Sequence, residues 1–204
     1  MFVVATHFGD HDLSWIPELA GDDYFVYDRS GNCGLPNSVP RENIGDADLD
    51  RLSYIIDNYH DLPDVFMLTK SNIFKYISKE EFDVVKNNQV FTPLLTQNHK
   101  TYSDDRGRPV CYYQDGMYYE VNNSWFLNEV PALYFNSWTE WAKAFHLPNP
   151  PYIPFAPGGN YILTREKVHK YAVDYYEEMR STLTHSSKPG EAQLVERSLY
   201  LLWR

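Results

Sequence analysis

The sequence has little of what marks a secreted, metal-binding or membrane protein. It contains two cysteines, Cys33 and Cys111, and they form no Cys-x-x-Cys pair. Residues 1–10 lack the basic flank and the long apolar run of a secretory signal, and no apolar stretch approaches the length of a membrane span. We therefore expect free thiols, a reducing cytoplasmic location and no membrane-spanning segment.

Dense basic runs are also absent, which bears on the choice of partner. The formal net charge at pH 7 is −10, with 18 Lys and Arg residues against 28 Asp and Glu residues. Because proteins bind nucleic acids largely by neutralising phosphates with clustered Lys and Arg, we expect no nucleic-acid partner. A small phosphorylated ligand remains compatible, since it needs only a few local cations, backbone N–H groups or a metal ion.

Several catalytic and metal-binding signatures are missing as well. There is no His-Glu-x-x-His sequence, no set of four cysteines and no Gly-x-Ser-x-Gly sequence, which argues against zinc proteases and α/β-hydrolases. Isolated histidines are usually surface or hydrogen-bonded core residues. Of the seven histidines, His7 at a predicted strand end and His185 before the last predicted helix are the two worth keeping as site candidates.

What the chain does contain is apolar and aromatic material. Hydrophobic residues make up 43% of the sequence, and neither a repeat nor a low-complexity segment divides it. We therefore expect one domain over residues 1–204, alone or as the N-terminal part of a longer chain. The 5 Trp, 17 Tyr and 11 Phe residues suit core filling in the main, and also contact with flat ligands.

The first half of the chain alternates between strand and helix patterns. Apolar β-branched runs predict strands over residues 2–6, 24–28 and 65–69. Helical spacing predicts a short helix within residues 12–21 and a longer one near residues 49–59, while the Gly- and Pro-rich residues 29–43 are expected to form a loop. Ser78 followed by Glu81 is a capping-box pattern that predicts a further helix.

The second half combines a hairpin pattern with more helices. Aromatic runs around Asp115-Gly116 predict a β-hairpin, and the prolines of residues 146–154 favour an extended connection without a regular ladder. An apolar strand follows Gly159, a helix is expected from Thr164 to about Met179, and a last helix ends the chain. Together these elements predict an α/β fold with a mixed, mostly parallel central sheet flanked by helices.

Ligands of such sheets usually bind outside the carboxyl ends of the strands. These ends carry Thr6 and His7 after the first strand, Asp28 after the second, and Lys70 to Asn72 after the third. Asp28 could accept hydrogen bonds from a ribose, or it could cap the Ser-Gly turn that follows. The two readings are equally supported by the sequence.

Three further positions are candidate site residues, and each also has a purely structural explanation. Arg41 could hold a diphosphate through its guanidinium, or it could form a surface ion pair with Glu42 or Asp46. Gly158-Gly159 marks either a tight turn or a place where a ligand lies against the backbone. Glu191, at the start of the last helix, is either stabilised by the helix dipole or able to take a proton from an attacking hydroxyl.

The order of these segments resembles compact GT-A-type nucleotide-sugar glycosyltransferases. It also resembles GT-A-like proteins of fungi, bacteria and large viruses, among them the N-terminal glycosyltransferase domain of a chlorella-virus capsid-glycan enzyme. The similarity runs from Val3 to Trp203. The segments that carry it are VVATHFGDHDLSWIPEL, VYDRSG, LPNSVPREN, YIIDNYHDLPDVFMLT, GGNYILTREKV and GEAQLVERSLYLLW.

The resemblance implies roles for particular residues. It places Glu191 as the base of an inverting enzyme and Gly158-Gly159 on the wall where donor sugar and acceptor meet. The residues implied to border the nucleotide, ribose and phosphates are Thr6, His7, Asp28, Asn37, Arg41, Asn43, Lys70 and Asn72. For a virus-encoded protein the cytoplasm would be that of the host.

The resemblance also implies a divalent cation, Mn²⁺ or Mg²⁺, held by an Asp-x-Asp sequence after the third predicted strand. This chain has Lys70-Ser71-Asn72 there, so either Lys70 replaces part of the charge or the diphosphate itself holds the ion. The resulting hypothesis is sugar transfer from a nucleoside diphosphate donor, expected to be UDP-based, to a glycan hydroxyl. The alternatives are a catalytically silent nucleotide- or carbohydrate-binding module and a nucleotide-sugar hydrolase.

Overall fold

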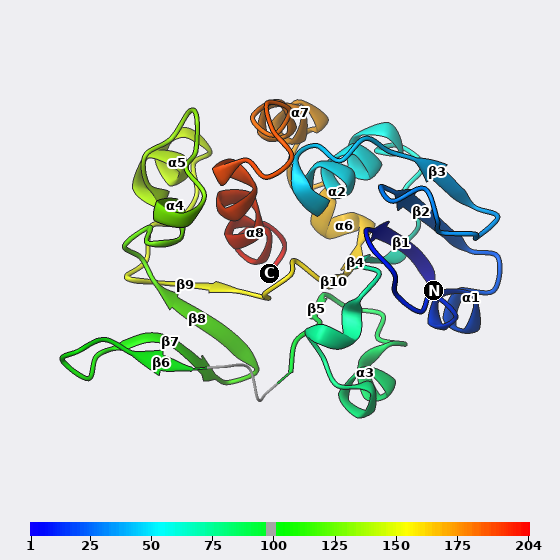
Figure 1. The fold of residues 1–204 in the computed structure, drawn as a ribbon, viewed down its shortest axis with the longest axis horizontal. Helices are drawn as coiled ribbons and strands as arrows, with labels where there is room; N and C mark the ends of the chain where they lie inside the picture. The colour runs from blue at the N-terminus through cyan, green and yellow to red at the C-terminus, as the bar shows by residue number, and fades with distance from the viewer. Residues whose placement is uncertain (97–100) are drawn as a thin grey trace.

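The computed structural model describes residues 1–96 and 101–204. Its centre is a six-stranded sheet with the order β3-β2-β1-β4-β10-β5 (Figure 1). The strands β3, β2, β1 and β4 run parallel to one another, whereas β10 is antiparallel to both β4 and β5. The predicted α/β class with a mixed, mostly parallel sheet is confirmed. The strands of this sheet are β1 Phe2–His7, β2 Tyr24–Asp28, β3 Ser38–Pro40, β4 Val65–Lys70, β5 Thr92–Pro93 and β10 Tyr161–Thr164.

Side-chain alternation along the central strands builds a core on each face of this sheet. Val4 and Phe66 pack on one face with α2, α7 and α8, while Val3 and Met67 pack on the other with α1 and α3. Both faces are covered, which is why these strands are apolar throughout. The helices are α1 Trp15–Ala20, α2 Asp46–Asp57, η1 Ile73–Lys75 (a 3-10 turn), α3 Lys79–Val85, α4 Phe126–Glu129, α5 Trp138–Ala144, α6 Arg165–Val168, α7 Val173–Ser181 and α8 Gly190–Trp203.

A second, antiparallel sheet lies at the opposite end of the molecule from α1 and β3 (Figure 1). Its order is β6-β7-β8-β9, and β7 and β8 form the predicted hairpin around Asp115-Gly116. A buried ion pair joins this sheet to α8, because Arg197 Nε donates to Glu120 Oε2 at 2.5 Å. The strands are β6 Tyr102–Ser103, β7 Pro109–Gln114, β8 Met117–Val121 and β9 Tyr152–Phe155.

The structure corrects the prediction for residues 146–154. The prolines do not prevent a ladder, because Tyr152–Phe155 pairs with β8 as strand β9, with Pro154 opposite Tyr119. This strand lies at the edge of the second sheet, where a missing N–H on the outer side removes no ladder bond. The prediction of a connection without a regular ladder was therefore wrong for residues 152–155, which form an edge strand.

Two other predicted segments differ from the structure. The predicted loop 29–43 contains the short edge strand β3. The helix predicted from Thr164 is two helices, α6 and α7. At the break, the Tyr176 hydroxyl donates to Val168 O and the Tyr59 hydroxyl donates to Tyr171 O. The capping box of Ser78 and Glu81 is confirmed at the start of α3.

Both cysteines are buried, and neither is part of a disulfide. Within residues 1–96 and 101–204, none of the helices combines the length and the apolarity that crossing a membrane would require.

Candidate functional site

A cavity of about 280 Å³ opens at the carboxyl ends of β1 and β4. The start of α2 and the segment before α8 close its other sides, so four elements distant in sequence meet there. Thr6, Asn43, Lys70 and Asn72, all expected from the strand-end rule or the resemblance, face this cavity. Its lining is formed by Thr6, Phe8, Arg29, Asn43, Asp46, Ala47, Lys70, Ser71, Asn72, Tyr76, Ser187 and Lys188.

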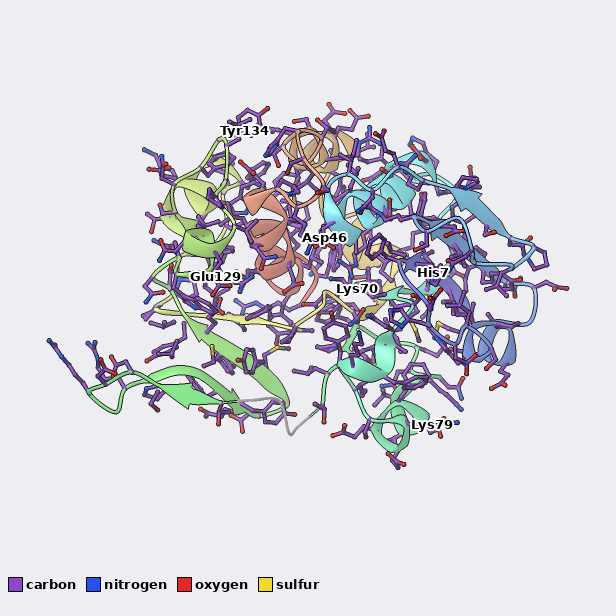
Figure 2. All side chains as sticks on the ribbon, viewed as in Figure 1. His7, Asp46, Lys70, Lys79, Glu129 and Tyr134 are labelled. Atoms are coloured by element: carbon purple, nitrogen blue, oxygen red, sulfur yellow. The ribbon has the colours of Figure 1, made fainter. Side chains whose placement is uncertain are left out.

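The cation at the end of β4 is the central feature of the cavity. Lys70 Nζ lies 3.5 Å from Asp46 Oδ1, and Figure 2 labels both residues. Burial lowers the pKa of Lys70, but the nearby carboxylates of Asp46 and Glu196 outweigh it, so the pKa is raised from its ordinary value of 10.5. Lys70 therefore carries its full positive charge at neutral pH.

Asp46 begins α2 in an unusual conformation, with φ at 52°. Its N–H donates to Ser187 O at 3.2 Å, which ties the start of the helix to the segment before α8. Burial raises the pKa of Asp46, but Lys70 and the N–H of Ala47 outweigh burial, so the pKa is lowered. The charges of Asp46 and Lys70 thus stabilise each other inside the cavity.

Arg29 holds the loop that leads into α2. Its Nε donates to Asp50 Oδ2 at 2.7 Å, and its terminal nitrogens donate to the carbonyls of Ile44 and Asp46 at 2.7 and 2.5 Å. The guanidinium is buried with Asp50 but reaches the cavity wall. The strand-end rule pointed to this place, directly after the second predicted strand, but it assigned Arg29 no role.

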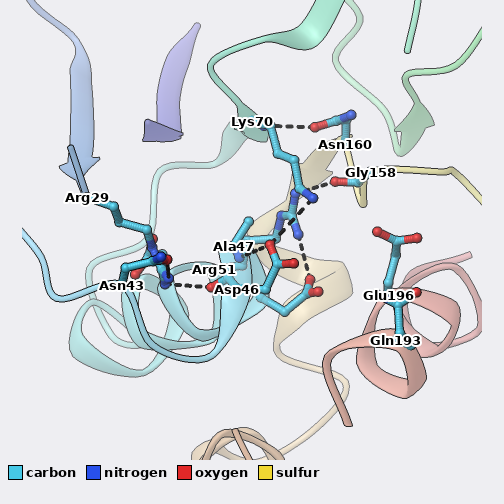
Figure 3. Close-up of polar contacts among 12 residues, drawn as sticks. Arg29, Asn43, Asp46, Ala47, Arg51, Lys70, Gly158, Asn160, Gln193 and Glu196 are labelled. Carbon is cyan, nitrogen blue, oxygen red and sulfur yellow. Dashed lines mark hydrogen bonds and ion pairs between the residues drawn. The ribbon is translucent and has the colours of Figure 1, made fainter. Parts of the chain in front are cut away.

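A second layer of charges supports the cavity from behind (Figure 3). Arg51 is buried and donates to Asp48 Oδ1 and to Gly158 O. Glu196 on α8 faces the same cluster with a side chain 13% exposed. Burial raises the pKa of Glu196, with Lys70 and Arg197 opposing the effect. In the sequence, Glu196 stands beside Arg197 next to an apolar stripe of the last predicted helix, and this pattern assigned it no site role.

Gly158 and Gly159 form a close approach to the protein's own side chains. Both have positive φ, at 84° and 65°, and a Cβ on Gly159 would lie 2.7 Å from Arg51 NH1. A Cβ on Gly158 would lie 2.6 Å from the Tyr76 ring. Neither glycine lines the cavity, but Gly158 packs behind Tyr76, which does. The tight-turn alternative is confirmed, and the wall position implied by the resemblance is not seen.

Asn160 and Asn72 are amide groups at the end of β4. Asn160 is fully buried, and its Oδ1 accepts from Lys70 N at 2.8 Å and from Thr69 Oγ1 at 3.2 Å. This fixes the backbone from which the Lys70 side chain extends. Asn72 also lines the cavity, and its Oδ1 is buried without a hydrogen-bond partner in the described part of the chain.

Asp28 and His7 stabilise neighbouring loops. The Asp28 carboxylate accepts from the backbone N–H groups of Ser30, Gly31 and Cys33 at 2.9 to 3.0 Å, so the loop-cap reading is confirmed. Burial raises the pKa of Asp28, but these N–H groups outweigh it and the pKa is lowered. His7 is buried, with Nδ1 3.1 Å from Ser71 Oγ. Neither Asp28 nor His7 lines the cavity.

Arg41 and Asn37 also lie outside the cavity lining. Arg41 donates to Ser53 Oγ at 3.0 Å, and its Nε is 3.6 Å from Asp50 Oδ1. The expected ion-pair alternative was right in kind, but the partner is Asp50 on α2. Asn37 Nδ2 donates to Asp22 O at 2.9 Å, at the amino end of β2, so the structure does not bring it to the carboxyl ends of the strands.

Glu191 is fully buried at the start of α8. Its Oε1 accepts from the N–H groups of Leu133 and Tyr134, both at 2.7 Å, and its Oε2 lies 3.5 Å from His185 Nε2. Glu191 is outside the cavity lining, and its carboxylate anchors the loop that carries Tyr134. The general-base role stays a prediction, and the contacts favour an anchoring role.

The lining does not fit the carboxylate metal site that the resemblance implies. Within the described ranges, no group of three or more His, Cys, Asp or Glu side chains is placed to hold a metal ion. The carboxylate in the cavity lining is that of Asp46, and the ammonium of Lys70 already lies against it. A divalent cation there would be repelled by Lys70.

The sequence matches the family described as Protein of unknown function (DUF3431) over residues 2–204, and the chain belongs to that family. No curated protein and no solved structure matches it.

Proposed function

We propose that this protein is a glycosyltransferase that moves a sugar from a nucleoside diphosphate donor, expected to be UDP-based, to a glycan hydroxyl. The observation that carries the proposal is the charged ammonium of Lys70 in a cavity at the carboxyl ends of parallel strands. The mixed, mostly parallel sheet agrees with the GT-A resemblance of the sequence.

The lining groups suit the parts of such a donor. Lys70 would stabilise the negative charge that grows on the diphosphate as the bond to the sugar breaks. The amide of Asn72, which lines the cavity, would form a hydrogen bond with a ribose or sugar hydroxyl. Phe8, which is 58% exposed at the cavity, offers a flat apolar surface to a base.

The acceptor hydroxyl must lose a proton during transfer. Glu191 remains the base predicted from the resemblance, but its carboxylate would first have to give up the N–H groups of Leu133 and Tyr134. The lining carboxylate, Asp46, is paired with Lys70 and does not offer a metal ligand in this proposal.

The second candidate is a catalytically silent module that binds a nucleotide or carbohydrate. The observations that favour it are Lys70-Ser71-Asn72 in place of Asp-x-Asp and the burial of Glu191. Such a module would bind the donor without releasing UDP.

The two candidates separate in a paired experiment on binding and turnover. Titration calorimetry with UDP and a panel of UDP-sugars measures binding, and UDP release in the presence of mixed glycan acceptors measures transfer. Lys70→Met should weaken UDP binding about tenfold or more, because one charge-assisted contact is lost. Lys79→Met, exposed on α3 away from Lys70 (Figure 2), should leave binding unchanged.

Binding accompanied by UDP release that depends on an added acceptor supports the transferase, because release without an acceptor is hydrolysis. Binding without release under any acceptor supports the silent module, and absence of binding for every nucleotide tested would overturn both.

A further inference from the structure

We propose that the phosphate groups of the ligand are held by the ammonium of Lys70 without a divalent cation, and that Asp46 is the internal anion with which they compete. This inference rests on the proposed function for the identity of the ligand, but not for the phosphate site itself. The cavity lining does not fit the carboxylate metal site that the resemblance implies.

The ammonium is held in place from two directions. The backbone N–H of Lys70 donates to Asn160 Oδ1 at 2.8 Å, and Asn160 is fully buried. The Nζ atom lies 3.5 Å from Asp46 Oδ1. The Lys70 side chain is 21% exposed. A fixed, partly accessible cation at a strand end is a place for an anion.

Two nearby carboxylates pair with other cations, while Glu196 lies behind the cavity and acts on Lys70 from there. Asp48 pairs with Arg51 at 2.5 Å, and Asp50 pairs with Arg29 at 2.7 Å. Neither carboxylate belongs to the cavity lining. Asp46 is therefore left as the lining carboxylate, and a divalent ion bound to it would lie beside the Lys70 ammonium.

The charge of the lining favours an anion in a molecule that is acidic as a whole. Arg29, Lys70 and Lys188 are the lining cations and Asp46 is the lining anion, while the net charge of the chain is −10. Arg29 is neutralised by buried Asp50, which leaves Lys70 and Lys188 against Asp46. A phosphate that displaces Asp46 from Lys70 would bring more charge and more acceptor oxygens than the carboxylate.

The inference predicts opposite effects for the two partners of this ion pair. Lys70→Met removes the cation and should weaken binding of inorganic pyrophosphate about tenfold or more. Asp46→Asn removes the competing charge and should strengthen binding several-fold. Asparagine tolerates positive φ well, so this variant should keep the backbone at the start of α2.

The experiment is calorimetric titration of the full chain with pyrophosphate and with UDP, in EDTA and again with Mn²⁺. We expect binding in EDTA within about twofold of that with Mn²⁺, the opposite shifts for the two variants, and no change for Lys79→Met. Thermal unfolding of each variant checks that it is folded. If Lys70→Met is unfolded, the change in pyrophosphate affinity of Asp46→Asn and the comparison of binding in EDTA and in Mn²⁺ still test the inference.

Two outcomes would overturn the inference: binding that is lost in EDTA and restored by Mn²⁺, or pyrophosphate affinity that is the same in wild type and Lys70→Met. These outcomes are independent of the proposed function. Metal-free pyrophosphate binding without UDP release would support the phosphate site and count against the transferase. Transfer that needs Mn²⁺ would support the transferase and end the inference.

Discussion

At the scale of single residues, several candidate site residues form hydrogen bonds within the protein. Asp28 and Glu191 are carboxylates at the positions expected for a ligand contact and a base, yet each accepts backbone N–H groups. A carboxylate that accepts two or three N–H groups is a strong local anchor, because charge-assisted hydrogen bonds exceed neutral ones. The sequence alone does not separate the two uses, since both need an acid in the same place.

Glu191→Gln should separate the anchor from the base. The neutral amide oxygen accepts the Leu133 and Tyr134 N–H groups more weakly, so we expect the free energy of unfolding to fall by roughly 1–2 kcal/mol. A general base would add a loss of transfer of about a hundredfold or more. Urea denaturation and UDP-release rates measure the two effects, with Glu129→Gln on the exposed face of α4 as the control.

An unchanged free energy of unfolding would contradict the anchoring role of Glu191. A large loss of rate with unchanged donor binding would establish the base instead.

Asp28 should make stability depend on pH in the acid range. Its pKa is lowered in the folded state from an ordinary value of 3.8, so its contribution is complete above that value and is lost as pH falls through the lower, folded-state pKa. Asp28→Asn should therefore be less stable than wild type at pH 7, and the difference should shrink toward pH 3. Urea denaturation at several pH values measures this difference, and a pH-independent difference would count against the loop cap.

At the scale of elements, the central strands could be predicted and the edges could not. Buried parallel strands are apolar throughout, which made β1, β2 and β4 visible. The strands β3 and β9 lie at sheet edges and contain proline, so their sequences look like loops. The site residues divide in the same way. The rule that ligands bind at the carboxyl ends of the central strands found Thr6, Lys70 and Asn72, which line the cavity. It could not tell which of several carboxylates would pair with Arg41.

The turn between β9 and β10 should be sensitive to one methyl group. Gly159 has φ at 65° and Gly107 has φ at 74°, so alanine at either position has a similar backbone cost of about 1–2 kcal/mol. A Cβ at Gly159 also meets Arg51 at 2.7 Å, while nothing lies within 4 Å at Gly107. Gly159→Ala should therefore lower the free energy of unfolding by about 1–3 kcal/mol more than Gly107→Ala.

Chemical denaturation of the two glycine variants measures this difference directly. Equal losses would show that Arg51 moves aside without cost and that the turn does not support the charged cluster.

At the scale of the whole molecule, one cavity gathers the segments that the sequence separates. Four segments meet around Lys70: the ends of β1 and β4, the start of α2 and the segment before α8. A hydrogen bond from Asp46 N to Ser187 O joins the last two. The sequence predicted that strand ends would meet. It did not predict that α2 and α8 would complete the site, because that depends on how both helices pack on the same face of the sheet.

The central claim is that a nucleoside diphosphate binds in this cavity. The most direct test is a titration of uniformly ¹⁵N-labelled protein with UDP, followed by two-dimensional NMR of the backbone amides. We predict that the largest shift changes fall on Thr6, Asn43, Lys70 and Ser71, and that in Lys70→Met they need about tenfold or more higher UDP concentration. Changes confined to the second sheet, or no change at millimolar UDP, would contradict the account.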